Sequence, residues 1–353
     1  MRNKRHIFPI SYLLIIVLSF SICVNGCGKI DNDTQIVLTA GFARDVVFKI
    51  EDLKCTLPEM MVYLTNIQNQ YEDIYGDKIW DTKINGVTLE NNIKEVALSR
   101  MAQVKTLTLL AGQRGIALDE KEKAKVNEIA KMYFDSLSQS EKDALQADED
   151  IIRNLYEEYA LSTKVYESII KDINPEISDD EARTITVSHI FFKTYAYDDD
   201  GNRVSYDESH KAEAKDEADY VLLLLQEGGE FEKYAREYSD DEEITISFGK
   251  GEKDEIFENA AFALGSDELS GIIETEYGYE IIKCLSTFNR EVTDENKIKI
   301  VEKRKQEAFT KEYEEFAKQI TKNVNQQLWD SVTFVHGDDI DTHDFFEVFD
   351  SNY

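Results

Sequence analysis

Two titratable side chains stand among apolar residues in stretches that read as β-strands. Glu280 lies in ELSGIIETEYGYEIIKCL, a hydrophobic run entered through a glycine, and His189 lies in VSHIFFK, between Val187 and Phe191 on one strand face. A lone histidine in that setting is more often a satisfied core residue than a reactive one, and a carboxylate there requires an explanation. Any chemistry of the two side chains depends on the elements that bring them together.

Other polar clusters fit binding templates poorly. The acidic stretch DDDGNRVSYDE, residues 198–208, combines carboxylates with a glycine, which suits calcium, but it misses the EF-hand spacing at the first position and Asp207 is a weak bidentate ligand. Asp241 lies in SDDEE, which by default is a solvated turn. The glycine pairs around residues 228 and 250 fit no phosphate-binding motif. The sequence therefore predicts no metal site and no cofactor.

The N-terminus has the order of a secretory signal. Basic residues among the first five precede an apolar run over residues 10–24, which ends in VNGC. This ending resembles a bacterial lipobox, in which the peptide is cut before a cysteine that is then acylated, here Cys27. An uncleaved membrane anchor would need about 20 apolar residues. We expect residues 1–26 to be a lipoprotein signal peptide and Cys27 to anchor the chain to the outer face of the bacterial cell membrane.

Composition limits the partners. The 353 residues include 71 acidic and 40 basic ones, a net charge of −31, which argues against binding nucleic acid. Of four cysteines, Cys55 and Cys284 lie beyond the expected lipid-bearing Cys27, and one distant pair is not a disulfide framework. The length suffices for two domains with sizeable cores.

Helical spacing dominates both ends of the chain. After a tether, residues 27–45, a strand is expected at 46–50 and helices follow up to residue 177; Thr56 and Glu59 fit a capping box at the first helix. Residues 291–335 again show an apolar helical stripe, which needs a partner. The tail, residues 336–353, is acidic and aperiodic, and we expect it to be disordered.

The central region has a different pattern. From Arg183 the sequence alternates with a period of two, which is typical of a strand. Shorter helices follow, and a closing strand ends near residue 288. Residues 183–288 should therefore form a compact α+β unit in which the first and last strands pair.

Four stretches of this unit resemble parvulin-type peptidyl-prolyl isomerases, and they occur in the order of that family. They are VSHIFFK, GGEFEKYAREYSDD, SFGKGEKDEIFENAAFAL and DELSGIIETEYGYEIIK. The signal and the flanking helices resemble the PrsA-type foldase lipoproteins and the related periplasmic chaperone SurA. The resemblance implies an α+β protein with a discontinuous helical chaperone domain, residues 46–177 and 291–335, and an inserted parvulin-like domain, residues 183–288, whose small antiparallel sheet is flanked by helices.

The resemblance also implies site residues. In parvulins a histidine on the first strand faces a second histidine on the last strand; the first corresponds to His189, whereas the family's GYH is GYE here and Glu280 replaces the second. The acid of the family's network corresponds to Asp241 and its hydroxyl to Thr275. A carboxylate beside an imidazole only accepts hydrogen bonds, so we expect Glu280 within hydrogen-bonding range of His189 and a raised pKa of the imidazole.

The pocket walls match the family in part. Phe257 corresponds to the proline-contacting phenylalanine and Phe248 to a nearby aromatic residue. Lys253 stands in place of the usual methionine, and EEITIS replaces the usual GGDLG. Rotation about an X-Pro bond faces a barrier of roughly 20 kcal/mol and requires no bond to be made, so a dry pocket and well-placed donors suffice for catalysis. These departures predict weak catalysis, and the fold is unaffected by them.

Three functions are compatible with these patterns to different degrees. The first is an extracytoplasmic foldase that isomerises X-Pro bonds in unfolded or newly exported proteins; selection of phosphorylated targets is disfavoured because the loop that is basic in phosphate-selective parvulins is acidic here. The second is a holding chaperone with a degenerate, non-catalytic parvulin domain. A solute-binding lipoprotein lacks support, because the alternating strand-helix pattern of such proteins is absent from the sequence.

Overall fold

The computed structural model describes residues 42–84, 86–199 and 201–353 of the chain. The expected signal peptide, the lipid-bearing Cys27 and most of the tether lie outside the described residues. Within the described part, no helix is both long enough and apolar enough to cross a membrane.

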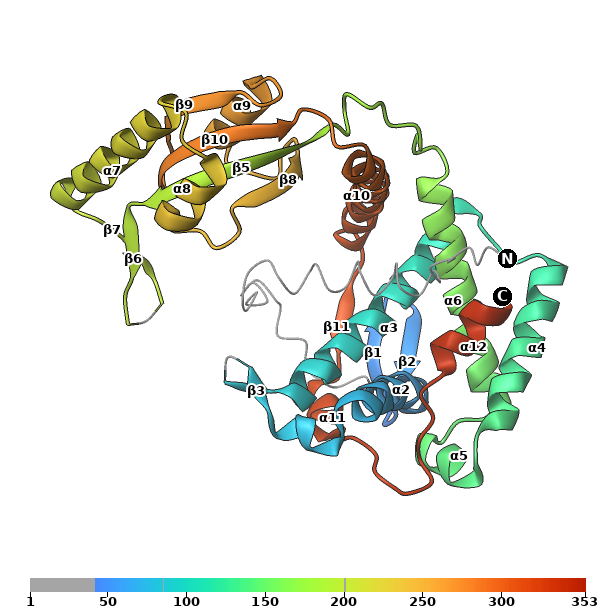
Figure 1. Ribbon diagram of the computed structural model, residues 1–353. Coiled ribbons are helices and arrows are strands. Elements are labelled where there is room, and N and C mark those ends of the chain that lie inside the picture. Colours follow the sequence, from blue (N-terminus) through green and yellow to red (C-terminus); the bar gives the residue numbers. More distant parts are fainter. Residues whose placement is uncertain (1–41, 85, 200) are drawn as a thin grey trace, which may run out of the picture. The chain divides into compact units, whose positions relative to one another are not determined.

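The described residues form two compact units (Figure 1). The helical unit comprises the described residues up to Asp172 together with Gln306–Tyr353, and the sheet unit comprises Ile173–Lys305. The chain therefore leaves the helical unit once, forms the sheet unit and returns. Helix α10 (Arg290–Ala317) begins in the sheet unit and ends in the helical unit.

The helical unit joins segments from both ends of the chain. Its other elements are β1 (Val46–Ile50), β2 (Leu53–Thr56), α2 (Leu57–Tyr75), η1 (Asp77–Asp81), β3 (Lys83–Ile84), β4 (Val87–Thr88), α3 (Leu89–Arg114), α4 (Glu120–Ser136), α5 (Gln139–Leu145), α6 (Glu149–Ile170), β11 (Lys322–Val324), α11 (Gln326–Ser331) and α12 (Phe345–Asn352). Strands β2, β1 and β11 form an antiparallel sheet in the order β11-β1-β2. The backbone N–H of Thr56 donates to Glu59 Oε2 at 2.6 Å, in the predicted capping box.

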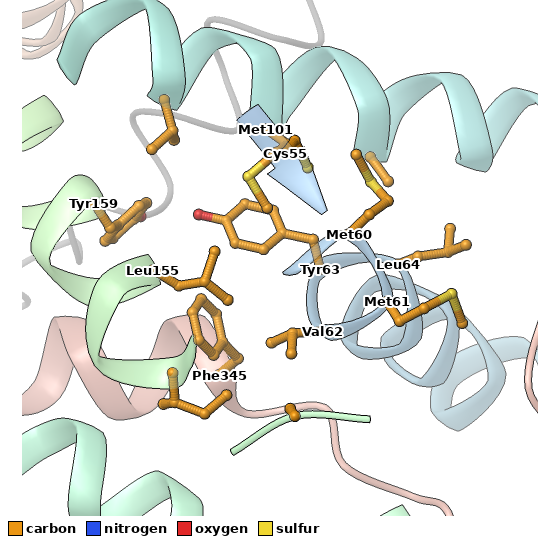
Figure 2. Packing of buried hydrophobic residues seen from close by; sticks show 14 of the residues in the cluster. Cys55, Met60, Met61, Val62, Tyr63, Leu64, Met101, Leu155, Tyr159 and Phe345 are labelled. Atoms are coloured by element: carbon orange, nitrogen blue, oxygen red, sulfur yellow. The ribbon is translucent and has the colours of Figure 1, made fainter. Parts of the chain in front are cut away.

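Aromatic and aliphatic side chains fill the core of the helical unit. Figure 2 shows the ring of Tyr63, from α2, lying among Cys55, Leu155, Tyr159 and Phe345, which come from β2, α6 and α12. All five side chains are buried. The core therefore depends on contacts between residues almost 300 positions apart in the sequence.

The stripe on α10 that lacked a partner in the sequence has one in the structure. Phe309 is buried in a second cluster with Leu107 of α3 and with Val165 and Tyr166 of α6. The rings of Phe309 and Tyr166 meet edge to face with centroids 5.3 Å apart. The helices before and after the sheet unit therefore pack against each other.

The expectation of a disordered tail is wrong. Phe345, Phe346 and Phe349 of α12 are buried, and the backbone N–H of Phe345 donates to Asn66 Oδ1 at 3.0 Å. The Tyr156 hydroxyl donates to the carbonyl of Phe345 at 2.7 Å. Three phenylalanines in eight residues bury enough apolar area, at roughly 1.5–3 kcal/mol for each side chain, to offset the entropy of ordering an acidic segment.

The sheet unit is built on one antiparallel sheet. Its elements are β5 (Thr184–Lys193), β6 (Tyr195–Tyr197), β7 (Arg203–Ser205), α7 (Glu208–Gln226), α8 (Phe231–Tyr238), β8 (Thr245–Gly249), α9 (Glu255–Ala263), β9 (Leu269–Glu274) and β10 (Gly278–Ser286). The strand order is β8-β5-β10-β9, so the first and last long strands pair as the sequence predicted. The fold is α+β, with a small antiparallel sheet flanked by helices.

Period-two alternation separates two apolar layers in the sheet unit. Ile190, Phe192 and Ile281 pack with α7 and α8 on one face. Val187 and Ile282 pack with α9 on the other. This second face also carries the candidate site.

A glycine at the start of β10 permits close contact with β5. A Cβ at Gly278 would lie 2.0 Å from the carbonyl oxygen of Phe192, and the residue has φ +153°. Only glycine fits this approach, which sets the register of the two central strands.

Candidate functional site

Neighbouring strands bring His189 and Glu280 together on the α9 face of the sheet. In the β5–β10 register His189 lies opposite Ile282, so Glu280 is its diagonal neighbour two residues along β10. The Nδ1 atom of His189 lies 3.0 Å from Oε2 of Glu280. The two residues are 4% and 9% exposed. The carboxylate that stands among apolar residues in the sequence is thus partnered by the imidazole.

The second ring nitrogen has a backbone partner. Nε2 of His189 lies 3.0 Å from the carbonyl oxygen of Glu243. A carbonyl only accepts, so Nε2 must carry a proton and donate it. A second proton is then shared between Nδ1 of His189 and the carboxylate of Glu280.

Two opposing effects act on this pair. Burial disfavours the charged ring of His189, but the hydrogen bond and charge of Glu280 outweigh it and the pKa of His189 is raised. Burial likewise raises the pKa of Glu280, against the lowering effect of the His189 bond. The pair therefore retains its shared proton to a higher pH than an isolated histidine would.

Asp241 and Thr275 lie outside this hydrogen-bonded pair. Oδ2 of Asp241 is 3.9 Å from Nε2 of His189, and its side chain is 51% exposed, so its influence on the ring is electrostatic. The Thr275 hydroxyl donates to the carbonyl of Gly278 at 3.1 Å and accepts from the Tyr277 N–H at 3.2 Å. The structure thus places Thr275 in the β9–β10 turn, where it holds the entry to β10.

One of the two aromatic residues expected in the pocket wall contacts the imidazole, and the second packs on the first. Phe248 of β8 and Phe257 of α9 are buried with ring centroids 5.7 Å apart. The ring of Phe257 meets the His189 ring edge to face at 5.9 Å. Lys253 precedes α9 and is exposed, and its charge is close enough to lower the pKa of Glu280. A cation thus lies near the site.

Sequence reasoning missed two groups that hold the acidic loop against β5. The carbonyl of Glu243 had no signal, because every residue offers a backbone acceptor. Ser239 Oγ accepts hydrogen bonds from the N–H groups of Phe191, at 3.1 Å, and Asp241, at 3.2 Å. A serine directly after a short helix is typical of such side chain–backbone turns, and this signal was available in the sequence.

The stretch considered for calcium follows β6 and includes β7 and the first residue of α7. Tyr195 pairs with Ser205 and Tyr197 with Arg203 across the hairpin. Asp207 caps α7, accepting from the His210 N–H at 2.9 Å. Among the residues that the structure describes, no group of three or more His, Cys, Asp or Glu side chains is arranged to hold a metal ion.

A comparison with family models identifies the class of this region. Residues 189–286 match the rotamase family, described as the PPIC-type PPIase domain. The match begins at His189 and includes Glu280, so it covers the whole site described above. The sheet unit therefore contains a parvulin-type peptidyl-prolyl isomerase domain.

Relatives of the whole chain are foldases. The chain is 24% identical over 355 aligned residues to foldase protein PrsA of Clostridium botulinum strain Langeland, covering 90% of this chain and 96% of that protein. Foldase protein PrsA 1 of Listeria monocytogenes strain F2365 is 31% identical over 121 residues, 32% of this chain and 37% of that one. The chain is a homologue of the PrsA foldases.

Solved structures of similar proteins were also found. PrsA from Bacillus cereus matches 76% of this chain and 97% of its own, with 20% identity and a TM-score of 0.35. PrsA from Bacillus subtilis matches 77% and 99%, with 23% identity and a TM-score of 0.26.

Proposed function

We propose that the chain is a membrane-anchored extracytoplasmic foldase. In this proposal the sheet unit isomerises X-Pro bonds in newly exported proteins, the helical unit holds unfolded clients, and lipid on Cys27 anchors the molecule. The observation that carries the proposal is the buried His189–Glu280 pair within the matched isomerase domain. The PrsA relatives support the foldase assignment over most of the chain.

The proposed chemistry needs no cofactor. An X-Pro amide loses resonance as it twists, so an environment that favours the twisted form lowers the barrier without any bond being made. The His189–Glu280 pair would set the electrostatic environment below the amide, and Asp241 would add a negative charge. Phe248 and Phe257 would supply the apolar wall. Thr275 would act indirectly, by holding the turn that leads to Glu280.

Glu280 limits this chemistry in our proposal. Two neutral imidazoles can exchange donor and acceptor roles, whereas a carboxylate only accepts, so the pair is ionic and cannot offer the same neutral network. Lys253 adds water beside the pocket. We therefore expect isomerase activity well below that of a parvulin with both histidines.

A protease-coupled assay on a proline tetrapeptide tests this proposal. The double change Glu280→His and Lys253→Met should raise kcat/KM about tenfold, the effect of lowering a barrier by about 1.4 kcal/mol. His189→Ala should remove the residual activity. High activity of the unchanged protein that His189→Ala abolishes would contradict the limiting role of Glu280 and show that it replaces the second histidine in function.

Client holding without catalysis is the second candidate. Ile74 and Tyr75 at the end of α2, and Ile84 and Val87 on the β3–β4 hairpin, are exposed large apolar residues of the helical unit. Ile84 and Val87 are paired neighbours across the hairpin, and contiguous exposed apolar side chains are typical of interaction surfaces. If the His189→Ala protein still suppresses aggregation of an unfolded client as well as the unchanged protein, holding is independent of the isomerase site.

Anchoring can be tested through the proposed lipidated residue. Cys27→Ala should release the protein from membranes or leave its precursor unprocessed. Fractionation and size that match those of the unchanged protein would rule out lipid on Cys27.

A further inference from the structure

The segment that leads into α12 is held along its backbone by side chains of the helical unit. Residues 332–344, all of which the structure describes, form neither helix nor strand and pass close to α5 between α11 and α12 (Figure 1). The polar backbone groups of such a segment need partners outside a helix or sheet ladder. Glu141 of α5 supplies two of them, because its carboxylate accepts from the N–H groups of Asp341, at 3.2 Å, and Thr342, at 2.7 Å.

Amide side chains of α2 contact the same segment. Nε2 of Gln68 donates to the carbonyl of Val335 at 2.8 Å, and Oε1 of Gln68 accepts from the Val335 N–H at 3.2 Å. Nδ2 of Asn69 donates to the carbonyls of Ile340, at 3.3 Å, and Thr342, at 2.9 Å. Backbone groups are nearly the same in every residue type. These contacts therefore recognise a polypeptide backbone with little dependence on its sequence.

Three phenylalanines of α12 follow this segment and enter the core. Phe345, Phe346 and Phe349 are spaced i, i+1 and i+4, so they share one side of a helical turn. The ring of Phe349 meets that of Tyr159 edge to face with centroids 4.9 Å apart. The guanidinium of Arg100 lies 3.5 Å from the ring centroid of Phe346. Aromatic side chains thus supply the selective part of this contact.

The tail, residues 336–353, carries charge of the same sign as the group that holds it. It includes six acidic residues and no lysine or arginine, and the chain as a whole has a net charge of −31. Asp338, Asp339 and Asp341 are exposed and lie in or next to the stretch that Glu141 binds. Like charges repel, which weakens the docking of the tail. Release of the tail also breaks no strand pairing, because none of its residues belongs to a sheet.

The surface that holds residues 335–349, the tail site, is formed by Gln68, Asn69, Arg100, Glu141 and Tyr159. We propose that the tail site is a peptide-binding site for clients and that the tail fills it as an intramolecular competitor. The occupant that the tail replaces is an unfolded segment with few acidic residues and with aromatic side chains at i, i+1 and i+4. The inference rests on the proposed client-holding function and specifies where a client binds.

Phe349→Ala loosens the tail without changing the tail site. Loss of a buried phenylalanine weakens docking, so the open fraction and the apparent affinity for a client rise together. In an aggregation assay with reduced insulin B chain, this variant should reach half-maximal suppression at about one tenth of the concentration that the unchanged protein needs.

Phe309→Ala is the matched control for this assay. It removes an equally buried ring from the second cluster of the helical unit, away from the tail site, and no gain in suppression is expected. Equal suppression by the unchanged and Phe349→Ala proteins would overturn the inference. So would an equal gain in Phe309→Ala, because the gain would then come from general loosening of the core.

A labelled peptide of residues 336–353 reports the tail site directly. The tether gives the tail of the unchanged protein an effective concentration of about 1 mM, so this protein should bind the peptide at least about tenfold more weakly than the Phe349→Ala protein does. A peptide with Asp338→Asn, Asp339→Asn and Asp341→Asn should bind more tightly at low salt, and one with alanine in place of its three phenylalanines should not bind. Equal binding of all three peptides, or none to the Phe349→Ala protein, would contradict the proposed site.

Hydrogen exchange measures the opening of the tail in the unchanged protein. The amides of Thr342 and Phe345, which donate to side chains of the helical unit, should exchange at least about tenfold faster than those in the middle of α3. This difference is expected because the tail opens without unfolding of the whole unit. Equal exchange rates would mean that the tail leaves only on global unfolding, and the inference would be wrong.

The peptide measurements separate this inference from client holding itself. Tight binding of the peptide by a Phe349→Ala protein that suppresses no aggregation would support the tail site and contradict the holding function. Suppression that excess tail peptide does not relieve would leave holding intact and overturn the inference. A dimer of the unchanged protein that the tail peptide dissociates would identify the tail of a second copy as the occupant and overturn the assignment to clients.

Discussion

Each unit of this protein buries charged side chains, but in different settings. In the helical unit, Nζ of Lys105 lies 2.7 Å from Glu59 and 2.8 Å from Glu158, and the lysine side chain is 2% exposed. In the sheet unit, one imidazole meets one carboxylate, His189 and Glu280, on neighbouring strands of the sheet. The first group lies within a core, and the second lies near the half-exposed carboxylate of Asp241.

The comparison shows that burial of charge alone does not mark a functional site. Burial lowers the pKa of Lys105, but Glu158 and Glu59 raise it further, so the ammonium stays charged at any physiological pH. His189 has an ordinary pKa of about 6.5, and the hydrogen bond and charge of Glu280 raise this pKa against the effect of burial. What distinguishes the sheet unit is a buried ion pair that contains an imidazole.

Breaking the buried triad should have the largest effect. Lys105→Met leaves Glu59 and Glu158, whose side chains are 13% and 17% exposed, without a cation, which costs about 3 kcal/mol of unfolding free energy. Trp80 and Trp329 are both buried in the helical unit, so urea unfolding followed by tryptophan fluorescence measures this loss. Lys131→Met removes an exposed pair with Asp135 and is the matched control, with no measurable change expected.

A loss below about 1 kcal/mol for Lys105→Met would mean that the triad relaxes or hydrates, and the contrast between the units would weaken. The isomerase activity of the sheet unit should be unchanged in either case, provided that the protein is folded. A fall in activity without a fall in stability would show that the two units are coupled.

Removing the aromatic anchor of the tail should have the next largest effect. Phe345 is fully buried and stacks on Tyr156 with ring centroids 4.4 Å apart. Phe345→Ala should cost about 3 kcal/mol in the same fluorescence experiment, through lost burial and the cavity left behind. The exposed Tyr353→Ala is the control and should cost far less. Equal losses for the two variants would argue that α12 adds little to the core.

The tail also shows where sequence reasoning failed. Its acidic residues and lack of periodicity outweighed its phenylalanines, because the groove that receives them is formed by α2, α4 and α6, far away in the sequence. By contrast, the β5–β10 pairing follows from period-two alternation in each strand. Local patterns predicted the helices and strands. The folding of the last segment depends instead on burial against residues far away in the sequence.

The candidate site, like the fold, was predictable from the sequence in part. The family resemblance placed Glu280 beside His189, and the structure has them in contact at 3.0 Å. It also placed Thr275 in the network, whereas the hydroxyl bonds within its own turn. The acceptor for Nε2 is a backbone carbonyl, that of Glu243, and residue types carry no information about such partners.

Glu280→Gln should have the smallest effect on stability. It gives the sharpest test of the difference between the buried lysine group of the helical unit and the His189–Glu280 pair. The change keeps the shape of the side chain and removes its charge, so the free energy of unfolding of the sheet unit should fall by about 2 kcal/mol at pH 6. The resonances of β5 and β10 followed through urea unfolding measure this, since both tryptophans lie in the helical unit.

The pKa shifts of the pair determine whether the stability of the sheet unit rises or falls with pH. The pKa of His189 is raised in the folded state, so the stabilisation from its protonation is complete below about pH 6.5 and is lost as the pH rises through the folded pKa. Glu280, whose pKa is also raised, contributes a decline of the same sign that begins lower, at its ordinary pKa of 4.5. In Glu280→Gln the buried ring loses its anion, the pKa of His189 should drop below its ordinary value, and stability should rise with pH instead.

An exposed pair supplies the matched control for this titration. His210 lies 2.7 Å from Asp207 at the start of α7, and the hydrogen bond and charge of Asp207 raise the pKa of His210. Asp207→Asn should lower the pKa of His210 and change the pH profile of the sheet unit far less than Glu280→Gln does, because water already solvates that ring. If Glu280→Gln left both the pKa of His189 and the pH profile unchanged, the site would not contain a proton-sharing pair, and its burial would serve packing alone.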